Sequence, residues 1–201
     1  MPDTGAPYFI PFADPTDLVR DWPALSEDVA EAVADGLDAA GNAGIGSNVV
    51  QTVKTDTFST ASSTYQDVTG MSVTITPSIA SSKVLVIVSA SVGQSGVTSS
   101  SSVIRLSGGD STTSLVGDAA GNRFSAAHAL TDRNTSVWDT GRSQIEMTIV
   151  YLDSPNTTSP VTYTLQMAAD GTAWLNRSGN DIDGGRGART ASTITAIEVA
   201  A

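Results

Sequence analysis

The chain contains few side chains that could carry chemistry. His128 is the only histidine among the 201 residues, and there is no cysteine. A thiol nucleophile and a typical transition-metal site are therefore excluded. A Ser-His-Asp triad would need a serine on a sharp turn, and the sequence has no GxSxG elbow. We expect His128, which lies in the strand-like stretch FSAAHAL, to be structural, and we expect no catalytic residue and no metal ligand.

Paired carboxylates are the remaining candidates for catalytic groups, because two carboxyl groups can perform glycoside hydrolysis. Asp181 and Asp183 in GNDIDGGRG are flanked by glycine, a pattern that suits a turn or a calcium ion better than an acid with a raised pKa. Their spacing does not match an EF-hand loop. Glu146 and Glu198 fall in predicted strands, where we expect them to face solvent. A glycan-degrading enzyme is therefore a distant alternative, and we expect no cofactor.

Two tryptophans are candidates for contact with a glycan. Trp138 and Trp174 each have an arginine nearby in the sequence, Arg142 and Arg177 respectively. An aromatic ring offers a flat apolar surface on which a sugar can stack. Packing of both rings at the edge of the core is the simpler interpretation, and the two remain open.

Charge excludes one class of partner. The formal net charge is -11 and the isoelectric point is near 4.2, whereas sequence-independent binding of nucleic acid needs an excess of Lys and Arg. No stretch approaches the roughly 20 apolar residues of a membrane span, and the N-terminus lacks the basic and apolar regions of a secretion signal. We expect a folded chain with no nucleic-acid partner and no membrane insertion.

Residues 1–23 are expected to form an extended segment. The stretch PYFIPFADPTDLVRDWP is interrupted by prolines, which disfavour a regular helix. Its aromatic residues have no obvious local core, and exposed apolar clusters tend to mark interaction sites. Docking on another protein and folding back on the same chain are both open, with Tyr8, Phe9, Phe12 and Trp22 as the candidate contacts.

Residues 24–40 show the one clear helical pattern. Leu25, Val29, Val33 and Leu37 recur at helical spacing and line one face. A helix this short is marginal alone in water, so it must pack against something. Its own β domain and a small bundle of identical subunits are equally open. The Gly-rich stretch GNAGIGSN, residues 41–48, follows as a flexible linker.

From residue 49 to 201 the pattern alternates as in β-strands. In MSVTITP and PVTYTLQM, apolar residues occupy every second position, which indicates half-buried strands. KVLVIVSASV is apolar on one face and partly apolar on the other, so we expect a central strand whose second face is covered by a neighbouring subunit or a loop. Many short strands without intervening helices predict a mainly β protein, an antiparallel β-sandwich or jelly roll.

The β region also resembles a known family. The blocks VVQTVKTDTFSTASSTYQDVTGMSVTITPSIASSKVLVIVSASVG, YLDSPNTTSPVTYTLQM and RTASTITAIEVAA, in this order, look like the distal domain of tailed-bacteriophage structural proteins, especially tail-fibre and minor tail proteins. PFADPTDLVRDWPALSEDVAEAVADGLDAAG is similar to segments near the start of actinobacteriophage minor tail proteins.

The resemblance implies a virion component without catalytic residues, homotrimeric, held to another virion protein by residues 1–23 and projecting its β domain. A tail or tail-tip protein for host recognition or adsorption is the first expectation, with a host-surface glycan as a candidate partner. So little chain separates the helix from the β domain that no long fibre shaft is encoded. A capsid decoration or head-fibre protein therefore remains the alternative.

Overall fold

The structure is a computed structural model that describes residues 27–35, 45–94, 101–109, 111, 115–131, 144–185 and 187–199. A helix spans residues 27–35, and ten strands follow within the described part of the chain. The strands are β1 (Ile45–Lys54), β2 (Phe58–Thr60), β3 (Gln66–Ile75), β4 (Lys83–Gln94), β5 (Ser101–Ser107), β6 (His128–Thr131), β7 (Gln144–Asp153), β8 (Val161–Asp170), β9 (Ala173–Leu175) and β10 (Ser192–Val199). The prediction of a mainly β protein is confirmed.

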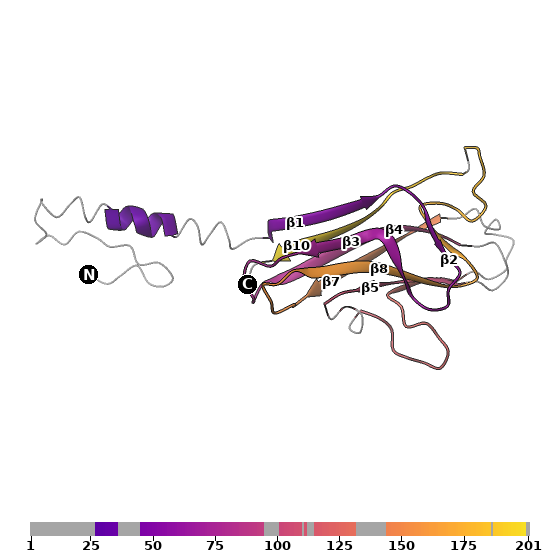
Figure 1. The fold of residues 1–201 in the computed structure, drawn as a ribbon, viewed down its shortest axis with the longest axis horizontal. Helices are drawn as coiled ribbons and strands as arrows, with labels where there is room; N and C mark the ends of the chain where they lie inside the picture. Colours follow the sequence, from indigo (N-terminus) through magenta and orange to yellow (C-terminus); the bar gives the residue numbers. More distant parts are fainter. Residues whose placement is uncertain are drawn as a thin grey trace, which may run out of the picture.

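The strands form two antiparallel sheets that face each other (Figure 1). Sheet A has the order β1-β10-β4-β9-β2, with β7 on the other edge of β4. Sheet B has the order β3-β8-β5-β6. When the three-residue strands β2 and β9 are left out, the order is β1-β10-β4-β7 in one sheet and β3-β8-β5-β6 in the other. This is the double Greek-key order of a jelly roll.

The core lies between the two sheets and follows the alternation of the sequence. β4 turns Val84, Val86, Val88, Ala90 and Val92 inward, all fully buried. Since β4 pairs with β10, β7 and β9, it is the central strand that its two-sided apolar pattern predicts. Sheet B contributes large buried side chains from β3, β5 and β8, among them Met71, Ile104, Leu106, Tyr163 and Leu165.

The boundaries differ from the prediction at three places. β1 begins at Ile45, within the predicted linker 41–48, because Ile45 pairs with Val199 across an irregularity before Val49. The strand predicted from MSVTITP begins earlier, since β3 runs from Gln66 and its register shifts between Asp67 and Ser72. The strand-like stretch FSAAHAL is reduced to β6, since residues 124–127 form no strand.

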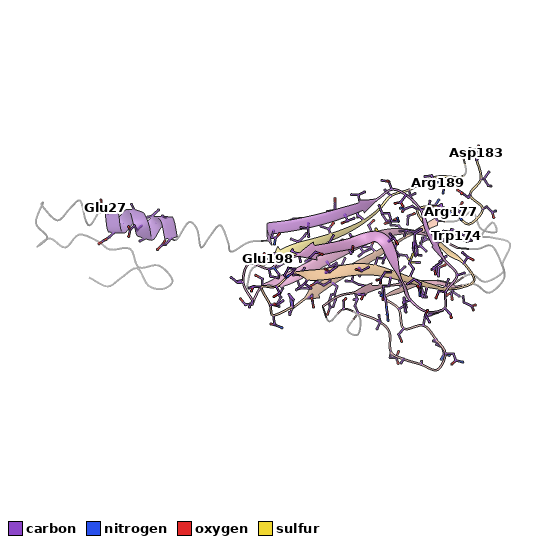
Figure 2. The ribbon with its side chains drawn as sticks, in the orientation of Figure 1. Glu27, Trp174, Arg177, Asp183, Arg189 and Glu198 are labelled. Carbon is purple, nitrogen blue, oxygen red and sulfur yellow. The ribbon has the colours of Figure 1, made fainter. Side chains whose placement is uncertain are left out.

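The domain has two distinct ends (Figure 1). β1 starts and β10 finishes at the end where the chain enters from the helix, which we call the proximal end. β9 and the segment between it and β10 lie at the opposite, distal end (Figure 2). The antiparallel pairing fixes this arrangement, because Lys54 at the end of β1 faces Ser192 at the start of β10.

Candidate functional site

The structure describes some of the predicted site residues and not others. Trp174 lies on β9 and is half-buried. Val29 is half-buried in the helix, and Val33 is 45% exposed there. The other predicted contacts lie outside the described residues: Tyr8, Phe9, Phe12, Trp22, Leu25, Leu37 and Trp138.

Trp174 belongs to a charged cluster at the distal end of the domain (Figure 2). The guanidinium of Arg177 lies over its indole ring, 5.2 Å from the centroid. Arg177 Nη1 donates to Asp181 Oδ2 at 2.7 Å, and Arg189 Nη2 lies 2.7 Å from Asp181 Oδ1 and 2.9 Å from Oδ2. One carboxylate therefore joins two arginines, and these four residues are called the distal cluster below.

Asp181 is held ionised by its partners. Partial burial by itself would raise the pKa of the carboxyl, but hydrogen bonds from Arg177 and Arg189 outweigh burial and hold the pKa below its usual value. A general acid needs the opposite shift. Both carboxylate oxygens are already engaged, so the calcium alternative loses its main ligand, and no group of three metal-binding side chains exists among the described residues.

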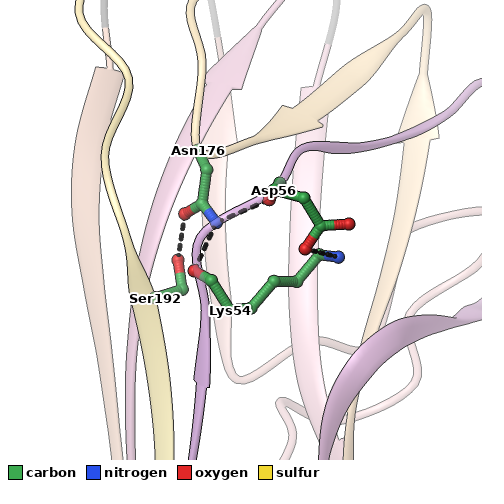
Figure 3. Close-up of polar contacts among 4 residues, drawn as sticks. All are labelled: Lys54, Asp56, Asn176 and Ser192. Carbon is green, nitrogen blue, oxygen red and sulfur yellow. Dashed lines mark hydrogen bonds and ion pairs between the residues drawn. The ribbon is translucent and has the colours of Figure 1, made fainter.

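The loop that carries the cluster is anchored by Asn176, which is fully buried (Figure 3). Its Nδ2 donates to the backbone carbonyls of Lys54 and Asp56 at 2.8 and 2.9 Å, and its Oδ1 accepts from Ser192 Oγ at 2.6 Å. Asn176 has a φ of 63°, a conformation that asparagine tolerates better than most residues. The distal cluster therefore starts from a fixed point shared by β1, β9 and β10.

Asn176 lies where the strand that pairs with one edge of β4 changes from β10 to β9. β10 pairs with β4 up to Ser89, and β9 takes over at Val92. Between them, the Ser91 amide donates to Ser192 Oγ at 3.0 Å, and its carbonyl accepts from the Asn176 amide at 2.9 Å. The Ser192 hydroxyl and the Asn176 backbone amide thus replace the missing ladder bonds, as buried backbone polar groups require.

The far side of the loop is tied to β7 and β4. Gln144 Nε2 donates to the Ala188 carbonyl at 2.9 Å, and Thr190 Oγ1 donates to Gln144 Oε1 at 3.0 Å. The backbone of Arg177 lies so close over Gly93 that a Cβ there would be 2.2 Å from the Arg177 carbonyl oxygen. These contacts therefore hold the backbone of the loop that carries Arg177 and Arg189.

The expectation for Glu198 is wrong, because it faces the core rather than solvent. It is fully buried at the proximal end, away from the distal cluster (Figure 2). Its Oε1 accepts from the Ser78 amide and hydroxyl at 2.7 and 2.6 Å, and Oε2 accepts from Asn48 Nδ2 at 3.4 Å. The carboxylate fastens the loop between β3 and β4. Glu146 on β7 is exposed, as expected, and accepts a hydrogen bond from Ser89.

His128 and Asp183 are both exposed, on β6 and in the distal loop respectively. Arg189 and Asn176 had not been predicted. Arg177 and Asp181 are four residues apart, a signal that could have suggested their pairing. Arg189 joins them only because the loop reverses at Gly184–Gly187, where the Gly187 amide donates to the Gly184 carbonyl.

Comparisons with known proteins found only weak structural similarity. No family model matches the sequence, and no curated protein is significantly similar to it. Three solved structures of infectious bursal disease virus proteins are weakly similar. The Gt strain structure shares 15% identity with a TM-score of 0.34, covering 76% of this chain and 38% of that one.

The VP2 subviral particle shares 13% identity with a TM-score of 0.31, covering 76% of this chain and 37% of that one. The Gx strain structure shares 15% identity with a TM-score of 0.27, covering 76% and 36%. This chain thus spans under two fifths of those chains. Among its own described residues, no helix is long and apolar enough to cross a membrane.

Proposed function

We propose that this chain is a non-catalytic virion structural protein of a tailed bacteriophage, associated with the tail, whose jelly-roll domain contacts the host surface through its distal end. The resemblance of its β region and N-terminal stretch to minor tail and tail-fibre proteins supports the virion assignment. In this proposal residues 1–23 attach to another virion protein, and three copies of the chain associate.

The polarity of the β domain is the observation that carries the proposal. The chain enters at the proximal end, and the distal cluster lies at the other end, as Figures 1 and 2 show. A domain tethered by its proximal end presents its distal loops outward. Functional residues gather on loops that a rigid scaffold positions, and the anchored loop 176–191 fits that pattern.

The distal cluster offers chemistry that suits a sugar ligand. Trp174 is partly exposed beneath Arg177, and the Arg189 side chain is 51% exposed. Arg189 keeps guanidinium donors beyond those used by Asp181, because the group has five N–H donors. An apolar ring edge beside free donors can bind a saccharide, and the ionised Asp181 supplies acceptors but no general acid.

The location is tested by gold-labelled antibody against the β domain on intact particles from the source. Label at the tail end is the expected result. Label over the capsid would replace the tail assignment with the decoration or head-fibre alternative, and unlabelled particles would overturn the virion assignment.

The distal contact is tested by binding of the labelled full chain to host cells. Arg189→Ala and Trp174→Ala should each weaken binding about tenfold, since the loss of one contact of about 1.4 kcal/mol has that effect. Arg123→Ala is the matched control, because Arg123 is an exposed arginine that bonds only its own loop, at Ala120. Equal binding by all variants would show that the distal cluster does not contribute to host binding. No binding by the folded wild type would overturn the proposal of host recognition.

A further inference from the structure

The outer face of sheet A carries an apolar row that crosses four strands. The ladder registers place Val49 opposite Ile197, Ile197 opposite Leu85, and Leu85 opposite Leu152. In the next row Thr195 faces Ile87, and Ile87 faces Val150. Residues that are directly opposite in an antiparallel pair share a face. One row of the outer face of sheet A is therefore apolar from β1 to β7, and the next row is apolar on β4 and β7.

This face is open to solvent in the single chain. Val49 is 52% exposed, Val150 is 58% and Leu152 is 47%, while Leu85, Ile87 and Ile197 are half-buried among them. Val53, also on β1, is 53% exposed. Isolated exposed apolar residues are ordinary, whereas a contiguous patch rimmed by polar groups marks an interaction surface.

Four of the polar side chains on this face already hydrogen-bond in two pairs. Gln51 Nε2 donates to Thr195 Oγ1 at 2.8 Å across the β1–β10 pair, and Ser89 donates to Glu146 across the β4–β7 pair. Covering a polar group costs free energy mainly when its hydrogen bonds are lost. A partner with an apolar surface could therefore cover this face without leaving those four groups unpaired.

Charge favours a second copy of the same chain as that partner. Each chain carries a net charge of -11, so identical chains repel one another over most of their surfaces. On the described outer positions of β1, β10, β4 and β7 the only formal charges are Lys83 and Glu146, which cancel. At this face two copies of the chain, each with a net negative charge, can therefore approach without that repulsion.

The position of the face fits association that begins at the helix. Its most apolar row, from Val49 to Leu152, lies toward the proximal end, where β1, the strand that follows the helix in the sequence, begins. The helix also leaves Val33 45% exposed. The sheet patch measures roughly 20 by 15 Å from strand spacing and rise, well below the about 800 Å² per partner of a standard interface. An interface through this face therefore needs further contact area, for which the helix is the candidate.

We propose that the outer face of sheet A is the surface through which copies of this chain associate, packed about a common axis with the helices. The proposal rests on the homo-oligomer in the proposed function but not on tail location or sugar binding. Its test uses the full chain, whose lack of cysteine makes any introduced thiol unique.

The experiment compares maleimide labelling of Val150→Cys and Ile182→Cys, with native mass measured on the same samples. Ile182 is a matched aliphatic residue in the distal loop, 36% exposed. In the oligomer the thiol at position 150 should react about tenfold more slowly than that at position 182, because it is reached only through rare opening of the interface. Dilution to the monomer should abolish the difference.

Each of the other outcomes identifies which part of the proposal is wrong. An oligomer in which both thiols react equally overturns this face and leaves oligomerisation standing. A monomer with a protected thiol at position 150 means that another part of the same chain covers the face, and a monomer with two reactive thiols means that the face is uncovered. Both monomer results overturn the proposal without bearing on host binding.

Discussion

Ser192 Oγ and Asn176 Oδ1 lie 2.6 Å apart in a fully buried contact between β10 and the segment that follows β9. The same Ser192 hydroxyl accepts the Ser91 amide of β4, and the same Asn176 amide group reaches the carbonyls of Lys54 and Asp56. Two side chains therefore join four separate stretches of sheet A.

Asn176→Ala should destabilise the domain by about 2–6 kcal/mol, because it removes the partner of two buried polar groups, the Lys54 carbonyl and the Ser192 hydroxyl, and each loss costs about 1–3 kcal/mol. The free energy of unfolding from urea titration measures this loss. Asn156→Ala is the matched control: Asn156 also has a positive φ, of 50°, but it is exposed and bonds only Ser154. Equal losses for both variants would show that backbone strain, not the buried network, sets the effect.

Glu198 should make stability depend on pH. Burial alone would raise its pKa, but hydrogen bonds from the Ser78 hydroxyl and amide and from Asn48 outweigh burial and hold the pKa below the usual 4.5. The unfolded chain then binds this proton first as the pH falls. The carboxylate contributes its full stabilisation above about pH 4.5 and loses it as the pH falls through the folded pKa.

The difference in urea midpoint between wild type and Glu198→Gln isolates this contribution, since all other groups are shared. The difference should be largest at pH 7 and narrow below pH 4.5. Glu146→Gln, at an exposed position, controls for the loss of one negative charge. A difference that stays constant with pH would contradict the assignment.

Gly109→Ala should be strongly destabilising. Gly109 has a φ of +54°, and a Cβ there would lie 1.9 Å from Asp153 Oδ2. Asp153 is buried and accepts a hydrogen bond from the buried Tyr163 hydroxyl, so it cannot move aside freely. We expect a loss of about 3 kcal/mol or more, from backbone strain of about 1–2 kcal/mol plus the clash.

Gly121→Ala separates the two causes, because Gly121 has a similar φ of +60° with nothing within 4 Å of the added Cβ. Its melting temperature should fall only by the share due to backbone strain. A fall as large as that of Gly109→Ala would mean that Asp153 yields to the methyl group.

Lys54 is a buried ammonium with an exposed partner. Its Nζ lies 2.8 Å from Asp56 Oδ1, and the two side chains are 4% and 79% exposed. Asp56→Ala should destabilise the domain, because it leaves a buried charge without its carboxylate. Lys54→Met keeps the packed stem and removes that charge, so its urea midpoint should stay closer to wild type. The reverse order would show that the ion pair contributes more than its desolvation costs.

The alternation of residues predicted the core faces well, because strand geometry forces every second side chain to one side. Met71, Val73 and Ile75 on β3 are buried as expected, and so are Val84, Val86, Val88, Ala90 and Val92 on β4. The same rule applies to Glu198, which shares its parity with Ile194 and Ala196. The prediction there failed because carboxylates are rarely fully buried, and the loop donors from Ser78 that offset the cost come from 120 residues away.

Breaks in the alternation were harder to interpret. Val68 and Met71 are both buried although they are three positions apart, an odd spacing that should put them on opposite faces of a regular strand; the intervening Gly70 has a φ of +79°. A register shift at this point keeps one strand continuous. The order of strands within each sheet depends on crossovers between distant segments, which no local pattern records.

The contact of Arg177 and Arg189 with one carboxylate, that of Asp181, could not be predicted from the sequence either. Only the reversal of the loop, set by Gly187 packing against the Ile182 carbonyl, brings the second arginine to the carboxylate. Trp174 and Arg177 could be singled out from their proximity in sequence, but their cation–π contact depends on the backbone held by Asn176.

The pairing of β1 with β10 also constrains the order in which the domain can fold. Gln51 and Thr195 bond across 144 residues of sequence, and β4 cannot complete its edge until both β9 and β10 arrive. Topologies dominated by such distant pairs fold slowly, in milliseconds to seconds. During synthesis the edges of β1 and β4 stay unpaired until β9 and β10 have been made. An incomplete chain would therefore expose unpaired, aggregation-prone strands rather than form a smaller stable domain.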